Sequence, residues 1–172
     1  PRYLICDQTG RQKCREYKTS FRSKYPNTEI IYASKALCTT GLLKIIESEG
    51  LGLDISSGGE LYTALKAECN PKGMYFHGNN KLKKEIEEAL EAGVHRFVVD
   101  NLEELKNLDE LTIKKGIRAD ILFRVNPGIE AHTHEGLQTG RIDSKFGLGK
   151  EQILEAVREA DKMKNVNFRG LH

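Results

Sequence analysis

The sequence predicts an α/β fold, an incomplete (β/α)8 barrel of the TIM type with about six strands. Short strand-like runs alternate with amphipathic helical segments along most of the chain, and this alternation indicates parallel strand pairing. Several runs are apolar on both faces, which is typical of strands that helices cover. Polar residues recur where the runs end, and barrel enzymes build their active sites at the carboxyl ends of their strands.

The N-terminal region, residues 1–28, is expected to hold a short strand and a helix that lead into the barrel. The run "RYLIC" at 2–6 has the apolar character of a strand, and segment 8–25 shows helical periodicity until Pro26 ends it. We expect the barrel domain to occupy residues 29–172.

The barrel region contains the regular part of the pattern. In the expected helix at 81–93, Leu82, Ile86 and Leu90 recur every four residues, which predicts one buried stripe and a solvated face of Lys and Glu. The expected strands are 29–34, 50–55, 73–78, 95–100, 119–125 and 167–172. The expected helices are 38–50, 58–68, 81–93, 101–116 and 150–165.

A doubly wound sheet is the alternative to the barrel. A dinucleotide-binding fold carries a glycine-rich turn after its first strand, whereas that turn reads "SKALCTTG" here. The barrel is also favoured by the polar residues at the expected strand ends, which are Lys35, Asp54, His77, Asp100, Asn126 and His172.

The barrel is expected to be truncated at both ends. A complete one needs about 250 residues, whereas this chain has 172, opens without methionine and stops in its sixth expected strand. An unclosed barrel exposes strand edges, so marginal stability or association is expected.

Composition narrows the class of partner. The chain is 38% hydrophobic and 30% charged, with 27 basic and 25 acidic residues, which indicates a globular core and gives no electrostatic reason for nucleic acid or membrane binding. No signal, transit or membrane-spanning pattern is present in the sequence, so we expect a cytoplasmic location and a small-molecule substrate. The four cysteines form no CxxC pair and are expected to be free thiols.

Lys35 closes the first barrel strand. Alternation along "IIYASK" places it on the face of Ile31 and Ala33. One interpretation is a rim lysine whose ammonium group extends into water. The other is a desolvated amine with a lowered pKa, able to condense with a carbonyl as a Schiff base. The residues alone leave both open.

The segment "DISSGGEL", 54–61, also has two interpretations. Its paired glycines lie at a strand-to-helix turn, where backbone N–H groups can bind phosphate. Ser57 and Glu60 have the spacing of a capping box, which explains the turn without a ligand.

The remaining candidates lie in polar connections. "FHGNNK", 76–81, places His77 at a strand end. The segment 124–149 has no clear element, which in a compact domain is typical of a functional loop. His132 and His134 suggest a metal, but no third ligand stands at fixed spacing, so we interpret them as a polar loop pair and predict no metal site.

Six motifs together resemble the N-terminal part of the diaminopimelate decarboxylases, pyridoxal-phosphate enzymes of the alanine-racemase-like barrel class. The resemblance runs in order through nearly the whole chain. "YASKA" is shared with ornithine and arginine decarboxylases, whereas "HGNNK" and "NPGIEAHTHEGLQTG" indicate the diaminopimelate branch. The motifs are "YASKA", "DISSGGEL", "HGNNK", "RVNPGIEAHTHEGLQTG", "DSKFGL" and "GLH".

The resemblance implies a set of site residues. Lys35 matches the lysine that forms the internal aldimine with pyridoxal 5'-phosphate. Asp54 and Glu60 match acids beside that lysine and the cofactor. His77 falls in a strand-end motif that lines the site, and Arg141 matches an arginine near the aldimine.

The activity implied is decarboxylation of meso-2,6-diaminopimelate to L-lysine and carbon dioxide, in a homodimer, with the cofactor ring as electron sink. The histidine that stacks on the cofactor lies two residues beyond "GLH" in the family, so His172 is not expected to be it. Leu37 and Cys38 depart from the family pattern after the lysine. The alternatives are another decarboxylase of the ornithine, arginine or carboxynorspermidine type, a non-catalytic pyridoxal-phosphate-binding barrel, and a barrel without cofactor.

Overall fold

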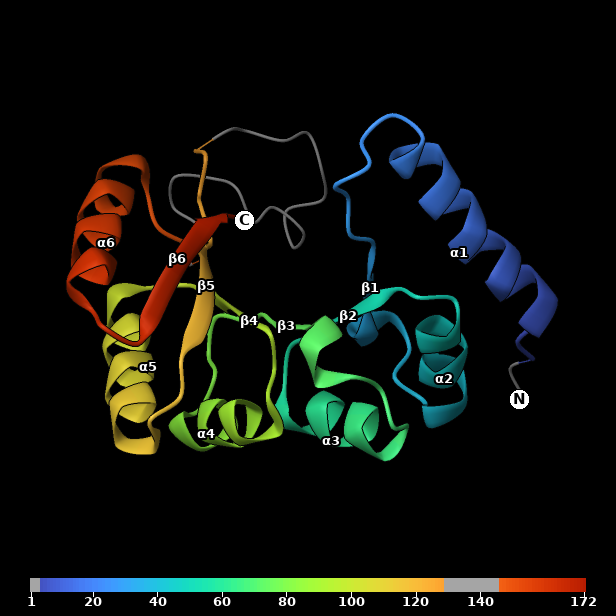
Figure 1. Ribbon diagram of the computed structural model, residues 1–172, viewed down its shortest axis with the longest axis horizontal. Helices are drawn as coiled ribbons and strands as arrows, with labels where there is room; N and C mark the ends of the chain where they lie inside the picture. Colours follow the sequence, from blue (N-terminus) through green and yellow to red (C-terminus); the bar gives the residue numbers. More distant parts are fainter. Residues whose placement is uncertain (1–3, 129–145) are drawn as a thin grey trace.

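The computed structural model describes residues 4–128 and 146–172. They form a six-stranded parallel sheet in the order β1-β2-β3-β4-β5-β6, with helices α2 to α6 around one side and α1 outside α2 (Figure 1). This open, barrel-like sheet confirms the expected α/β class. The strands are β1 Ile31–Ala33, β2 Gly52–Ile55, β3 Met74–Phe76, β4 Arg96–Val99, β5 Ala119–Phe123 and β6 Val166–Leu171. The helices are α1 Asp7–Arg22, α2 Thr40–Ser48, α3 Gly58–Lys66, α4 Lys83–Ala92, α5 Leu102–Lys115 and α6 Lys150–Lys162, and the 3₁₀ turns are η1 Ser34–Ala36 and η2 Pro71–Gly73.

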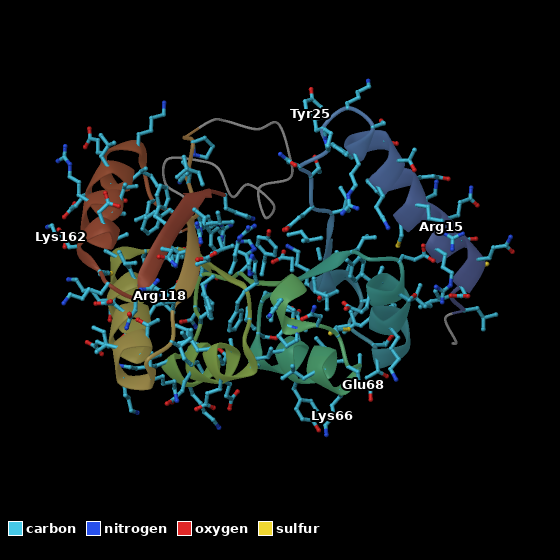
Figure 2. All side chains as sticks on the ribbon, viewed as in Figure 1. Arg15, Tyr25, Lys66, Glu68, Arg118 and Lys162 are labelled. Carbon is cyan, nitrogen blue, oxygen red and sulfur yellow. The ribbon has the colours of Figure 1, made fainter. Side chains whose placement is uncertain are left out.

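The core lies between the sheet and its helical layer. Ile55, Phe76 and Phe123 are fully buried there, and the rings of Phe76 and Phe97 lie 6.2 Å apart in register across β3 and β4. Charged side chains such as Lys66 and Glu68 are exposed on the outer side of the helical layer, away from the sheet (Figure 2). Apolar burial therefore fixes which strand face meets the helices.

The opposite face of the sheet is polar near the amino ends of the strands. Arg96 donates to the Tyr75 hydroxyl, which donates to the Glu29 carboxylate. Burial and this carboxylate raise the pKa of Tyr75 to about 12. Arg169 Nε pairs with Asp120 Oδ2 at 2.9 Å, from β6 to β5. The strands are therefore apolar toward the helices and largely polar on this concave side.

Helix α4 follows the expected stripe with one exception. Ile86 and Leu90 are buried at 1% and 3% exposure, whereas Leu82 is 60% exposed. The prediction for Leu82 was wrong because α4 begins at Lys83, so Leu82 is the N-cap residue and lies outside the packing stripe.

The N-terminal segment differs from the expectation. Residues 4–6 form no strand, and Leu4 is 96% exposed, because no described strand lies beside them to pair with; residues 1–3 lie outside the described part. Helix α1 ends at Arg22, three residues before the expected Tyr25. The domain boundary between residues 28 and 29 stays a prediction.

An ion-pair cluster attaches α1 to the end of α2. Arg15 donates from Nε and Nη2 to the two oxygens of Glu49 at 2.8 Å each, and Arg11 Nη1 adds a third contact at 3.2 Å. Lys18 Nζ donates to the Glu49 carbonyl at 2.6 Å. The Glu49 carboxylate is 8% exposed, so one acidic residue joins three basic residues of α1, two through its carboxylate and Lys18 through its main-chain carbonyl.

Acid is expected to loosen this attachment. Hydrogen bonds from Arg15, and then from Arg11, lower the pKa of Glu49 from 4.5 to about 2. Because the folded-state pKa is depressed, its stabilising effect is present above pH 4.5 and is lost as the pH falls toward 2. Hydrogen exchange, corrected for intrinsic rates, should show protection of α1 lost over this range. Glu49→Gln should reduce that protection already at higher pH, and Glu16→Gln on the exposed side of α1 should not; equal protection in both variants contradicts the attachment.

Candidate functional site

The carboxyl ends of the six parallel strands carry most of the expected site residues along one edge of the sheet. Lys35 follows β1, Asp54 lies in β2, and His77 and Asp100 directly follow β3 and β4. His172 follows β6. Arg141 lies outside the described residues, as do His132 and His134.

Lys35 lies in the turn η1 rather than in the strand itself. Ala33 pairs in register with Asp54, so Lys35 lies two residues beyond the position on β1 that is paired with Asp54. Its side chain is exposed, and no described residue pairs with its amine. Within the described residues this exposure is that of the rim-lysine interpretation, because β1 is the edge strand and only β2 pairs with it; the Schiff-base role of Lys35 stays a prediction.

Asp54, His77 and His172 form one contact group. His77 Nδ1 lies 3.7 Å from Asp54 Oδ2, and the His77 and His172 rings are in contact at a tilt of 52°, with centroids 4.5 Å apart. His77 Nε2 is buried and has no hydrogen-bond partner among the described residues. A carboxylate beside an imidazole with an unpaired nitrogen is an arrangement suited to proton transfer and to holding a polar ligand atom.

His172 is expected to make stability depend on pH. Burial first, and then the neighbouring His77, lower the pKa of His172 below 6.5. The unfolded chain therefore binds a proton at higher pH than the fold does, and stability falls as the pH drops from 6.5 toward that lower pKa. Replacing His172 with Phe should flatten the pH dependence of the unfolding free energy over this range in denaturant titrations; an unchanged slope contradicts the assignment.

A second contact group surrounds Asp100, whose side chain is 3% exposed. Its carboxylate accepts from Arg124 Nη1 at 3.0 Å and from Gly147 N at 3.1 Å. The Arg124 guanidinium also lies over the Phe146 ring at 4.7 Å. Gly147 has φ +74°, and a Cβ there would lie 2.9 Å from the Arg124 carbonyl oxygen, so glycine is required. These contacts hold Arg124, Phe146 and Gly147 together at the end of β4.

Arg124 was not singled out from the sequence. Its alternation with Asp120 and Leu122 places it on the concave face of β5, opposite the buried Ile121 and Phe123. This alternation with a period of two was the sequence signal that could have identified Arg124 as a residue of the concave face. The sequence instead indicated Asn126, which is 8% exposed and accepts from Gly128 N at 3.0 Å.

Glu60 stands at the amino end of α3. Ser57 Oγ accepts from Glu60 N at 3.2 Å, as expected of an N-cap. The Glu60 carboxylate accepts from Ser56 N at 2.6 Å, one residue before the N-cap, so the reciprocal half of the capping box was wrong. Gly58 N donates to Glu85 at 2.7 Å, so the protein already satisfies one N–H of this glycine turn.

Three other expectations concern the described residues as a set. They contain no group of three His, Cys, Asp or Glu side chains placed to hold a metal ion. None of the described helices is long and apolar enough to cross a membrane. Cys6, Cys14, Cys38 and Cys69 are free thiols.

Solved structures that resemble this chain include diaminopimelate decarboxylases. A mutant of the enzyme from Helicobacter pylori, complexed with L-lysine, matches with a TM-score of 0.93 and 34% identity over 100% of this chain and 43% of that one. The M. jannaschii enzyme in co-complex with L-lysine has a TM-score of 0.83 and 32% identity, over 96% and 39% of the two chains. The lysine/ornithine decarboxylase of Vibrio vulnificus, 23% identical with a TM-score of 0.73, shows the fold alone.

Sequence comparison also finds enzymes named diaminopimelate decarboxylase, from other organisms. Diaminopimelate decarboxylase of Halalkalibacterium halodurans is 42% identical over 164 residues, 94% of this chain and 37% of the relative. That of Bacillus subtilis is 39% identical over 174 residues, 100% of this chain and 40% of the relative. The chain thus spans about two fifths of the relatives it matches. The family model described as the pyridoxal binding domain of pyridoxal-dependent decarboxylases matches residues 11–172. The chain therefore belongs to the pyridoxal-dependent decarboxylase family.

Proposed function

We propose that the protein carrying this chain decarboxylates meso-2,6-diaminopimelate to L-lysine and carbon dioxide, with pyridoxal 5'-phosphate held covalently on Lys35. The observation that carries the proposal is the position of Lys35, directly after β1 and two residues beyond the position paired with Asp54, with an amine that no described residue engages. The names of the relatives and the L-lysine in two similar structures support this substrate and product.

The residues at the strand ends fit this cofactor. An aldehyde requires a primary amine that is not already paired, and Lys35 supplies one. Polar ring substituents require partners, and the buried Nε2 of His77 has none among the described residues. When bound, the cofactor supplies an electron sink for the electron pair left by the departing carboxylate.

Each side chain has a distinct task in this proposal. Lys35 attaches the cofactor and, once its amine is released, can carry a proton. Asp54 lies beside His77 Nδ1 at 3.7 Å and thereby orients Nε2 toward the site. Asp100 holds the Arg124 guanidinium in a fixed position at the end of β5. Cofactor contacts of Glu60 and Arg141 belong to the proposal, as do a homodimer and a cytoplasmic location.

Carbon dioxide release from a panel of amino acids tests the substrate. The whole protein, supplied with pyridoxal phosphate, is expected to decarboxylate meso-2,6-diaminopimelate in preference to ornithine, arginine and carboxynorspermidine. The isolated 172-residue chain is expected to show no turnover. Turnover of ornithine or arginine alone would reject the substrate, and bound cofactor without any carbon dioxide release would favour a non-catalytic barrel.

A further inference from the structure

A buried ion pair lies beneath the strand ends, in the connections that follow β3 and β4. Lys81 Nζ is 2.8 Å from Glu104 Oε1, and the two side chains are 1% and 7% exposed. Lys81 precedes α4, and Glu104 lies in the first turn of α5. The proposed chemistry uses neither residue.

The remaining polar contacts of the pair go to the backbone around two site residues. Lys81 Nζ donates to the Gly78 carbonyl at 2.5 Å and to the Val98 carbonyl at 2.8 Å. Glu104 Oε2 accepts from Asp100 N at 3.2 Å. Gly78 is the residue directly after His77. The pair therefore connects the loop that carries His77 to the loop that carries Asp100.

Stability alone does not account for such a pair. Removing two charges from water costs several kcal/mol per ion, and apolar replacements of buried pairs are often neutral or stabilising. Lys83 and Glu110 offer a comparison, because they also join the α4 and α5 region, at 2.6 Å, with side chains 53% and 64% exposed. That exposed pair has no hydrogen bond to the loops of the site.

We propose that the Lys81–Glu104 pair is a positioning device that fixes His77 relative to Asp100. Through these two residues it sets the His77 imidazole and the Arg124 guanidinium at the cofactor site. The inference rests on the proposed function, which it deepens: Lys81 and Glu104 are positioning residues that act through His77 and Asp100.

The test compares the whole protein with the double variant Lys81→Met/Glu104→Leu and with the matched control Lys83→Met/Glu110→Leu. Apolar replacement is expected to keep the unfolding midpoint close to that of the parent while the loop contacts are lost. The visible circular dichroism of bound pyridoxal phosphate should fall at least twofold, and kcat should fall by roughly 10–100-fold with a smaller change in KM. The control should keep all of these values.

A cofactor-independent readout separates this inference from the proposed function. Modification of His77 by diethyl pyrocarbonate, located by mass spectrometry, should be faster in the double variant than in the parent and the control, with or without cofactor. If the parent binds no cofactor, the proposed function fails, whereas the modification rates still test the positioning. If a stable double variant kept the parental dichroism, kcat and His77 reactivity, the positioning role of Lys81 and Glu104 would be overturned.

A second variant covers failure of the double variant to fold. Glu104→Gln keeps the side-chain shape and an oxygen that can accept from Asp100 N, but it removes the charge that holds Lys81. We expect reduced cofactor dichroism and faster His77 modification, and parental values for both would overturn the proposal.

Discussion

Replacing Lys35 with alanine is expected to abolish covalent retention of pyridoxal phosphate in the whole protein. The kcat should fall by roughly 10²–10⁴-fold or more, because the residue both attaches the cofactor and handles a proton. Lys44→Ala is the matched control, since Lys44 is another exposed lysine, on α2, 57% exposed and paired only with Glu68 at 3.7 Å. Stopped-assay kinetics and gel filtration of the cofactor-loaded variants measure both effects.

Lys35→Arg separates covalent chemistry from a rim charge. Arginine keeps the positive charge and the length of the side chain but does not condense with the aldehyde. We therefore expect Lys35→Arg to be as inactive as Lys35→Ala. Recovery of cofactor binding and turnover by arginine would support the rim-lysine interpretation, in which only the charge matters.

Truncation of Asp100 to alanine is expected to lower the free energy of unfolding by about 3–5 kcal/mol, the usual cost of removing one partner of a buried ion pair. The variant leaves the Arg124 guanidinium without its carboxylate and Gly147 N without its acceptor. Denaturant titration of the whole protein measures the loss. Because Arg124 faces the site, reduced cofactor affinity should accompany it.

Two further variants serve as controls for the stability loss of Asp100→Ala. Asp7→Ala breaks an exposed pair with Arg11, in which Asp7 is 60% exposed, and should cost only about 0.2–1 kcal/mol. Asp100→Asn keeps an acceptor oxygen and should lose less than the alanine variant. A loss at Asp100 no larger than at Asp7 would show that the end of β4 does not depend on this carboxylate.

The strand and helix order could be predicted because each element buries a face with its own period. The run 95–100 contains β4, Arg96–Val99, and its neighbours pair with it in sequence order. The same rule failed at residues 2–6, where an apolar run has no described strand to pair with and residues 4–6 stay unpaired. The local apolar pattern identifies a candidate strand, but the segment forms a strand only where a second strand lies beside it and pairs with it.

The sequence predicted the site residues whose positions are determined by strand ends. It did not predict contacts that depend on the loops and on strand register. Asp54 and His77 stand at adjacent strand ends, and the structure brings them together. The contact between the His77 and His172 rings depends on where β6 ends. The register of β6 shifts opposite Ile121 and Leu122, and no sequence pattern predicted that shift.

Lys81 shows the same limit for charge. It belongs to a run of Lys and Glu that predicted a solvated helix face, yet its side chain is 1% exposed. The prediction was wrong because Lys81 precedes α4 and turns inward to Glu104, a partner that lies on another helix. The sequence pattern distinguishes an apolar helix face from a charged one. It does not distinguish a buried ion pair from a solvent-exposed ion pair.

Borohydride trapping tests the central claim most directly. The whole protein is loaded with pyridoxal phosphate, reduced, digested and mapped by mass spectrometry for a pyridoxyl group. A single adduct on the peptide containing Lys35, absent from Lys35→Arg, is the predicted result. An adduct at one other lysine, or labelling spread over many lysines at equal yield, would contradict the assignment of Lys35 as the cofactor lysine.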